Sequence, residues 1–283
     1  MTAFDPRTTP ARPELAARHL QGVVAAVRFV DGRTHDVVEP QAPLRRAPSP
    51  DAGLLTEAVM GERVVVYETT DEGWAWGQLQ ADDYVGWLPA AALGPAGPPP
   101  TDKVAALRTL VFPAPDIKLP PLAGLPLGAR LPIVRQENTF AVTAAGGFIP
   151  AQHLARLDAY EPDFVAVAER FLGAPYLWGG KTSFGIDCSG LVQVALTACG
   201  IVCPRDSDMQ QRALGTAVAA NESFSNLRRG DLVFWPDHVA IMCDARRIIH
   251  ANAHRMAVAV ESLPEAIARI RATGCEVAAV KRL

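Results

Sequence analysis

The stretch "GIDCSGLVQVALTACG", residues 185–200, places a cysteine at the start of a predicted helix. Its apolar residues recur at the three- and four-residue spacing of one helix face, and Gly200 is a typical helix end. Cys188 therefore lies in the predicted first turn, where unpaired amides and the helix dipole favour a reactive thiolate. The alternative interpretation is a small apolar residue packed at a helix start, with Asp187 as an ordinary N-cap.

Two histidines on predicted strands favour the catalytic interpretation of this cysteine. "HVAIM" (238–242) begins with His238, and "RRIIHA" (246–251) carries His250. If a three-residue loop joins the strands, the two histidines are diagonal neighbours on one face, about 7 to 8 Å apart at the backbone. A two-residue loop would send them to opposite faces of the sheet.

A cysteine nucleophile needs an imidazole that accepts its proton and a third group that orients this imidazole. The candidates are Cys188, His238 and His250, with His254 as a weaker alternative for the third position. The first three side chains are also of the types that bind zinc, so a metal site is a further alternative.

The segments around the cysteine predict an α+β domain. Helical spacing recurs in residues 161–173 and 263–274, and strand-like runs occupy residues 231–235 and 275–283 beside the two histidine strands. Helices followed by an antiparallel sheet are typical of this class, and we assign residues 158–283 to the domain.

Upstream of this domain, the run "GPAGPPP" (94–100) separates two stretches of short predicted strands. "MGERVVVY" (60–67) is echoed by "LGARLPIV" (127–134), which predicts a repeat and hence two small all-β barrels. The predicted segments are an N-terminal extension (1–25), a first barrel (26–94), a linker (95–100) and a second barrel (101–157).

The composition argues against several classes of protein. The formal net charge of -3 gives no electrostatic argument for a nucleic acid or membrane partner. Five cysteines without a CxxC pair argue against a disulfide framework or a zinc ribbon. Residues 1–22 contain no apolar run of the length of a signal-peptide core, and no stretch reaches the roughly 18 apolar residues of a membrane span, so we expect a cytoplasmic protein.

The segments of the α+β domain together resemble one known family. "APYLWGGKTSFGIDCSGLV" (174–192), "PRDSDMQ" (204–210), "RRGDLVFW" (228–235), "HVAIM" and "IIHA" occur in the order found in NlpC-type cell-wall cysteine peptidases. This papain-like family cleaves the stem peptides of peptidoglycan. The resemblance implies an α+β papain-like catalytic domain preceded by two small all-β barrels of the bacterial SH3 type.

The resemblance also implies a role for each candidate residue. Cys188 is expected to be the nucleophile, His238 the base and His250 the residue that orients the base. Ala240 stands where the family usually has a glycine, and this difference leaves the catalytic set intact.

The domain order is similar to that of the γ-D-glutamyl-L-diamino acid endopeptidases, the dipeptidyl-peptidase VI type, which recycle cell-wall peptides. This implies hydrolysis of the γ-D-glutamyl-diamino acid bond in small murein peptides with a free N-terminal L-alanine, with no cofactor and no metal. The substrate-binding residues implied by the resemblance are Tyr176, Asp187, Ser189 and Ser207, together with Tyr84 and either Glu57 or Glu62 of the first barrel.

Other interpretations stay open at the level of sequence. Tyr176 could be a core residue, Asp187 an N-cap and Ser207 a loop hydroxyl. The protein could be an acyltransferase that uses the same thioester but excludes water, or a catalytically decayed scaffold that only binds peptidoglycan.

Overall fold

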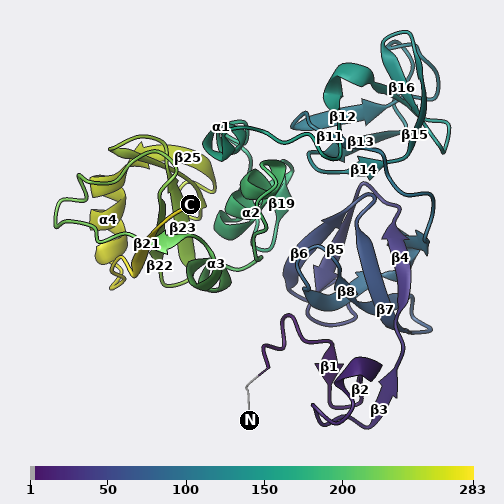
Figure 1. Cartoon of the computed structure of the whole chain (residues 1–283), viewed down its shortest axis with the longest axis horizontal. Coiled ribbons are helices and arrows are strands. Elements are labelled where there is room, and N and C mark those ends of the chain that lie inside the picture. Colours follow the sequence, from purple (N-terminus) through teal and green to yellow (C-terminus); the bar gives the residue numbers. More distant parts are fainter. Residues whose placement is uncertain (1–3) are drawn as a thin grey trace. The chain divides into compact units, whose positions relative to one another are not determined.

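The computed structural model describes residues 4–283, which form two compact units that divide after Ala159 (Figure 1). The first unit is almost entirely β-structure, and the second, Tyr160–Leu283, combines helices with a sheet. None of the helices between residues 4 and 283 is long and apolar enough to span a membrane.

The second unit is built on a six-stranded antiparallel sheet with the strand order β21-β26-β22-β23-β24-β25. The strands are β21 (Thr216–Ala217), β22 (Leu232–Trp235), β23 (His238–Met242), β24 (Arg247–Asn252), β25 (Ala257–Ser262) and β26 (Ala279–Arg282), and a separate hairpin pairs β19 (Lys181–Thr182) with β20 (Gly185–Ile186). The helices are α1 (Phe164–Glu169), α2 (Cys188–Ala198), α3 (Ser207–Ala213) and α4 (Leu263–Arg271).

These elements confirm the predicted α+β class of this unit. The structure has the helices predicted in 161–173, 185–200 and 263–274, and the predicted strands. It also contains α3 and β25, which the sequence pattern did not predict.

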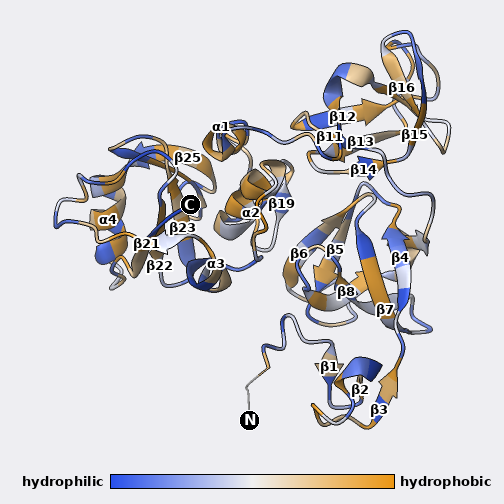
Figure 2. Cartoon of the chain, in the orientation of Figure 1, coloured by the Kyte–Doolittle hydropathy of each residue, from blue (hydrophilic) through white to orange (hydrophobic). Residues whose placement is uncertain are grey.

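Helix α2 begins where the sequence predicts because Asp187 caps it. The Asp187 carboxylate accepts a hydrogen bond from the amide of Gly190, which satisfies one of the unpaired donors of the first turn. Most of the helix is buried, and Figure 2 shows it largely in hydrophobic colours. Burial on most sides holds α2 against β23 and β24, so the position of Cys188 at its first residue is well defined.

Helix α4 packs on the same sheet through a single apolar face. Leu263, Ala266 and Ile267 join the core cluster formed by sheet residues such as Trp235 and Ile248. Ile270 packs against the same cluster, and the remaining positions are charged or exposed, in agreement with the mixed colours of this helix in Figure 2.

The register of β23 and β24 decides how the two predicted catalytic histidines face each other. Ile241 pairs with Ile249, Met242 pairs with Ile248, and the Cys243 amide donates to the Arg247 carbonyl, which leaves a three-residue loop, 244–246. This is the loop length on which the sequence prediction depends, and it is confirmed. The continued register places position 250 opposite position 240, diagonal to His238 on the same face.

The segment predicted as the first barrel contains a seven-stranded sheet with the order β10-β4-β7-β8-β9-β5-β6. The turns that join its strands place Gly73 and Asp83 in the left-handed region. The strands are β4 (Arg33–Val37), β5 (Gln41–Arg45), β6 (Leu54–Val59), β7 (Arg63–Thr69), β8 (Trp74–Leu79), β9 (Val85–Pro89) and β10 (Leu93–Pro95), and the 3-10 helix η2 (Ala90–Ala92) precedes β10.

The N-terminal segment folds against this barrel rather than standing apart from it. Its elements are β1 (Ala11–Arg12), β2 (Leu15–Ala17), η1 (Arg18–Leu20) and β3 (Arg28–Val30), and the three strands form a sheet of their own. The Arg12 guanidinium lies 4.7 Å from the ring centroid of Trp76 and 4.8 Å from that of Trp87. Since β3 belongs to the N-terminal sheet, the barrel sheet itself begins at β4.

Residues 101–157 form three small sheets, β14-β11-β18, β12-β13 and β15-β16-β17. Gly61 and Gly128, at equivalent positions of the two echoed sequences, both have positive φ. The predicted count of two barrels stays a prediction. The elements are β11 (Asp102–Val104), β12 (Arg108–Val111), β13 (Ala123–Pro126), β14 (Arg130–Leu131), β15 (Ile133–Glu137), β16 (Phe140–Thr143), β17 (Phe148–Pro150), η3 (Ala151–His153) and β18 (Leu154–Arg156).

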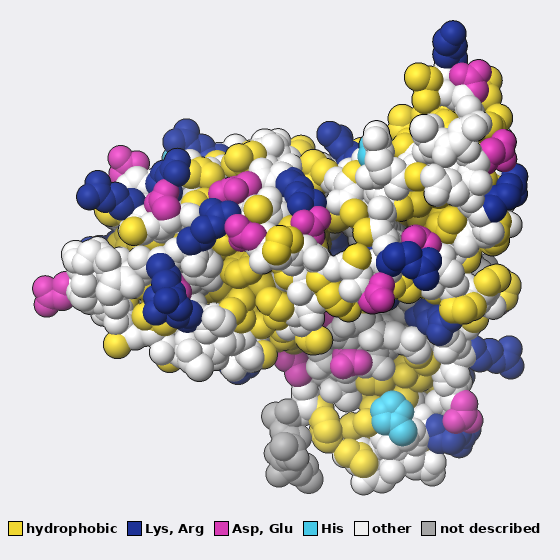
Figure 3. All heavy atoms as spheres, turned by 45° about the horizontal axis from the view of Figure 1, so that its top comes forward, with side chains coloured by type: hydrophobic (Ala, Val, Ile, Leu, Met, Phe, Trp, Pro, Cys, Tyr) yellow, Lys and Arg dark blue, Asp and Glu magenta, His cyan; other side chains and the backbone are white. Residues whose placement is uncertain are grey.

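Charged side chains of both signs are interspersed on the face drawn in Figure 3, and no large patch of one sign is visible there. This distribution agrees with the small formal net charge of -3.

Candidate active site

The sulfur of Cys188 lies beside the turn that leads into β23. Cys188 Sγ is 4.0 Å from the carbonyl oxygen of Asp237, and the backbone amide of Val239 donates toward the sulfur. These two residues flank His238, so the structure brings the thiol to the strand position that carries the predicted base. Cys188 is only 7% exposed, so little of its surface is open to solvent.

A line of hydrogen bonds continues from His238 away from the cysteine. His238 Nε2 is 2.7 Å from His250 Nδ1, and His250 Nε2 is 2.6 Å from Glu261 Oε1. Arg269 of α4 donates to the same carboxylate oxygen. His250 and Glu261 are both largely buried, so this line of side chains is held within the protein rather than by solvent.

Burial determines the resting charges of the Cys188 and His238 pair. It raises the pKa of Cys188 to about 12, and the negative charge of Asp187 adds to this shift. It lowers the pKa of His238 to about 3, with a further contribution from neighbouring His250. At neutral pH the thiol and the imidazole are therefore both neutral, so an attack by the sulfur would require a proton transfer.

These shifts predict the pH dependence of Cys188 alkylation by iodoacetamide. Because only the thiolate reacts, and because its pKa is raised, the rate should still rise about tenfold per pH unit in the range from about 7 to about 10. In the urea-unfolded chain, the alkylation rate of the same cysteine should level off above about pH 8.5. Mass spectrometry of the peptide that contains residue 188 measures both curves. A plateau below neutral pH in the folded protein would instead indicate a preformed thiolate-imidazolium pair.

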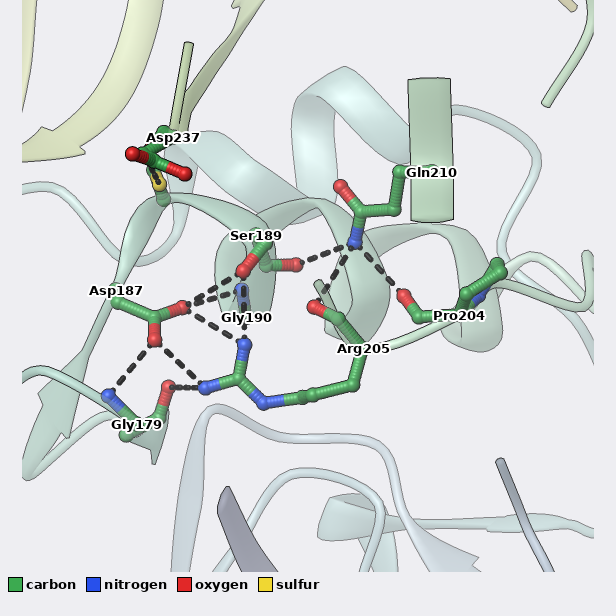
Figure 4. A network of polar contacts seen from close by, with 10 residues as sticks. Gly179, Asp187, Ser189, Gly190, Pro204, Arg205, Gln210 and Asp237 are labelled. Atoms are coloured by element: carbon green, nitrogen blue, oxygen red, sulfur yellow. Dashed lines mark hydrogen bonds and ion pairs between the residues drawn. The ribbon is translucent and has the colours of Figure 1, made fainter. Parts of the chain in front are cut away.

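The second cluster of the site is centred on Asp187, which directly precedes Cys188 (Figure 4). Arg205 reaches it with both terminal nitrogens, Nη1 to Oδ1 at 2.9 Å and Nη2 to Oδ2 at 2.7 Å. The same carboxylate accepts from the amides of Gly179 and Gly190 and from the Ser189 hydroxyl. Every oxygen of Asp187 is thus engaged within the protein.

This arrangement changes the expectation for Asp187. Its N-cap role, one of the two sequence interpretations, is confirmed by the bond to the Gly190 amide. Its proposed role as the counter-charge of a substrate ammonium stays a prediction, but the carboxylate is already paired with Arg205, whose side chain is 1% exposed. A substrate amine therefore meets an ion pair rather than an isolated negative charge.

Tyr176 lies near both clusters. It pairs with Ile186 as an isolated bridge and is half-buried. Burial raises the pKa of Tyr176 to about 12, and Cys188 and Asp187 contribute through their charges. Its hydroxyl is therefore protonated at neutral pH and is a donor close to the nucleophile.

Ser189 and Ser207 have different surroundings. The Ser189 hydroxyl lies between Asp187 and Arg205, at 3.3 Å from Asp187 Oδ1 and 2.9 Å from Arg205 Nη1. Ser207 is the first residue of α3 and is buried, outside the set of groups that contact Asp187. The substrate-binding role of both serines stays a prediction.

The candidate substrate-binding residues Tyr84, Glu57 and Glu62 all belong to the first unit. Tyr84 is 3% exposed and belongs to the barrel's core cluster. Glu62 Oε2 accepts a hydrogen bond from the Val59 amide at 2.9 Å, and Glu57 is also buried. Their contact with substrate stays a prediction. In the second unit, His254 lies exposed in the turn after β24, and it is His250 that contacts His238.

Sequence reasoning missed Arg205, Glu261 and Arg269. Arg205 lies inside the quoted segment 204–210, so its charge next to the motif was an available signal. Glu261 could have been found by the diagonal rule used for the histidines, but the strand Ala257–Ser262 was not predicted. Between residues 4 and 283, no group of three or more His, Cys, Asp or Glu side chains is arranged to hold a metal ion.

Comparison with known proteins identifies two domains. Residues 173–276 match the NlpC/P60 family, and residues 44–93 match the bacterial dipeptidyl-peptidase SH3 domain. A crystal structure of an NlpC/P60 family protein from Bacillus cereus superposes with a TM-score of 0.72 at 23% identity, over 88% of this chain and 99% of that one. The second unit thus has the NlpC/P60 papain-like fold.

Two named relatives are similar in sequence. Dipeptidyl-peptidase 6 of Lysinibacillus sphaericus is 33% identical over 115 residues, which are 41% of this chain and 41% of that protein. Gamma-D-glutamyl-L-lysine dipeptidyl-peptidase of Bacillus subtilis is 28% identical over 245 residues, 77% of this chain and 78% of that protein. The similarity to the first relative thus spans less than half of that protein, whereas the second is matched over most of its length.

Proposed function

Since the chain carries an NlpC/P60 domain behind a bacterial dipeptidyl-peptidase SH3 domain, we propose that it is a cysteine peptidase of peptidoglycan stem peptides. Its substrate is a short peptide with a free N-terminal L-alanine, and the bond hydrolysed joins γ-D-glutamate to the diamino acid. The observation that carries the proposal is the placement of Cys188 at the start of α2, with its sulfur beside the turn that leads into His238, together with the 2.7 Å contact between His238 and His250 on adjacent strands. The relatives named as γ-D-glutamyl dipeptidyl-peptidases support the choice of bond.

Attack on the substrate begins at the neutral pair. Cys188 Sγ bonds to the γ-carbonyl carbon of D-glutamate while its proton passes to the ring nitrogen of His238 that does not face His250, which is Nδ1. The amide of Cys188, in the first turn of α2, and the Tyr176 hydroxyl are donors for the developing oxyanion.

The second half of the reaction returns the proton. The tetrahedral intermediate expels the amine of the diamino acid, which takes the proton from His238, and leaves a thioester on Cys188. His238 then removes a proton from water, which attacks the thioester and releases the L-alanyl-D-glutamate half with a new carboxylate. The free thiol is regenerated, and no cofactor enters the sequence.

Selectivity for a free amine rests on neutral acceptors as much as on charge in this proposal. The Asp187 and Arg205 pair has no net charge, so the ammonium is received by oxygens such as Ser189 Oγ and by one edge of the Asp187 carboxylate. The preference is therefore expected to be smaller than for an unpaired buried carboxylate, about tenfold to a hundredfold.

A peptide panel tests the function and its selectivity together. We expect mass spectrometry to show cleavage of L-Ala-γ-D-Glu-diamino acid between the glutamate and the diamino acid, with incorporation of ¹⁸O from water into the glutamate product. The N-acetylated peptide should have a kcat/KM about tenfold to a hundredfold lower. Cleavage of cross-linked wall fragments in preference to the free tripeptide would contradict the proposal, and transfer to an added amine without ¹⁸O incorporation would indicate an acyltransferase.

The predicted cytoplasmic location and role in peptide recycling are part of the same proposal. Fractionation of the producing cells, with detection of the protein by antibody, tests the location. Recovery mainly from the medium or the wall fraction would contradict it.

A further inference from the structure

Glu261 ends the line of hydrogen bonds that begins at His238. Its carboxylate oxygen Oε1 is 2.6 Å from His250 Nε2 and also accepts from Arg269. The Glu261 side chain is 9% exposed and that of His250 is fully buried, so water does not compete for this contact. The proposed nucleophile, base and orienting group are Cys188, His238 and His250. Glu261 and Arg269 are additional to this set.

The chemistry of a carboxylate determines which nitrogen of His250 carries a proton. The hydrogen bond from His250, with support from Arg269, lowers the pKa of Glu261, so the carboxylate is ionised and can only accept. His250 must therefore donate from Nε2. In a neutral imidazole the other nitrogen, Nδ1, is then an acceptor.

The same reasoning carries the assignment to the base. His250 Nδ1 faces His238 Nε2 at 2.7 Å, so an acceptor there requires that His238 donates from Nε2. The lone pair of His238 is then on Nδ1, the nitrogen that does not face His250. This is the tautomer that a thiol proton needs, and the opposite tautomer would present an N–H to the thiol.

We propose that Glu261 is a positioning residue that fixes the tautomer of His250 and, through it, leaves the Nδ1 lone pair of His238 available to Cys188. Arg269 orients Glu261, since it donates to the oxygen that His250 also contacts. The inference rests on the proposed function only for the identity of the reaction, because the tautomers are properties of the resting protein.

Register supports a built arrangement rather than a chance contact. On β24 and β25, His250 pairs with Ala259 and Ile248 pairs with Glu261, so the two functional side chains are diagonal neighbours on one face. Arg269 comes from α4, which begins directly after β25 and packs on the sheet through Leu263 and Ile267. The charged or titratable groups around His250 are thus His238 on β23, Glu261 on β25 and Arg269 on α4.

The test reads the tautomers directly. In protein labelled with ¹⁵N-histidine, long-range ¹H–¹⁵N spectra, assigned with single-histidine variants, report which ring nitrogens carry protons near neutral pH. We expect the Nε2-protonated form for both His238 and His250. A proton on Nδ1 of neutral His250 would overturn the proposal without any variant.

Two substitutions separate the acceptor from the charge. Glu261→Leu removes the acceptor, and we expect mixed tautomers together with a loss of about 10- to 100-fold in kcat and little change in KM. Glu261→Gln keeps an oxygen that can accept hydrogen bonds from both His250 and Arg269. This variant should therefore retain the tautomer and most of the activity. Glu265→Leu, at an exposed position in the first turn of α4, is the matched control and should leave both readouts unchanged.

The outcomes distinguish this inference from the proposed function. If Glu261→Leu leaves the tautomers of a folded protein unchanged, or if Glu261→Gln loses as much as Glu261→Leu, then Glu261 does not act through the tautomer. If the tautomers follow the expectation but no stem peptide is hydrolysed, the positioning role stands and the proposed function fails. Thermal melting of each variant confirms that the spectra report a folded protein.

Discussion

Replacing Cys188 with alanine should lower the kcat for hydrolysis of the free tripeptide on the order of 10⁶-fold, to the level of the blank. In the proposed mechanism the sulfur is the group that forms the acyl intermediate, and His238, which is neutral at neutral pH, acts only as a base. The decisive measurement is product formation by mass spectrometry at enzyme concentrations high enough to detect a single turnover.

Cys199→Ala is the matched control for this variant. It makes the same chemical change at the other end of α2, at a half-buried position away from the site, and should leave kcat within about twofold. Binding of the peptide to the Cys188→Ala protein, measured by calorimetry, should persist. Retention of substantial hydrolysis by Cys188→Ala would remove the nucleophile assignment altogether.

Replacing Arg205 with methionine should lower the free energy of unfolding of the second unit by about 3 to 5 kcal/mol. The substitution keeps much of the apolar stem but leaves the Asp187 carboxylate, with a side chain 10% exposed, without the cation that pairs with it. An uncompensated buried charge costs far more than a lost surface contact. Urea denaturation followed by tryptophan fluorescence measures the change, since Trp235 lies in the core of this unit.

Two further variants show whether charge is the cause. Arg212→Met removes an ion pair with Asp208 that has a similar N–O distance, 2.9 Å, but the two side chains are 63% and 43% exposed. The loss in the free energy of unfolding should therefore stay under about 1 kcal/mol. Adding Asp187→Asn to Arg205→Met should recover part of the loss, because asparagine still caps α2 and carries no charge. Equal unfolding midpoints for Arg205→Met and Arg212→Met would show that the buried pair contributes no more than a surface one.

The structure also shows which group pairs with the Asp187 carboxylate. The resemblance seen in the sequence implies only that Asp187 binds the substrate. In the folded chain it is Arg205, eighteen positions later and without a fixed spacing to the motif, that neutralises this carboxylate. A pairing across a loop has no periodicity, so the charge of Arg205 within the segment 204–210 is visible in the sequence but its partner is not.

The features that could be predicted from the sequence depend on residues that lie close together along the chain. The helix that begins at Cys188 follows from its apolar spacing, the Asp187 cap and Gly200, and the diagonal placement of His238 and His250 follows from one loop length. Helix caps and hairpin registers depend on residues within a few positions of each other, and such interactions can be read in order along the chain.

The hydrogen bonds between elements that are distant in the sequence could be established only from the folded structure. Glu261 comes to His250 because β25 pairs with β24, and Arg269 comes to Glu261 because α4 packs back on the sheet. The resting charges of Cys188 and His238 also depend on burial, which is produced by all the surrounding elements together. Desolvation and long-range hydrogen bonds are properties of the packed interior, and for that reason the residues that tune the site lie outside its sequence motif.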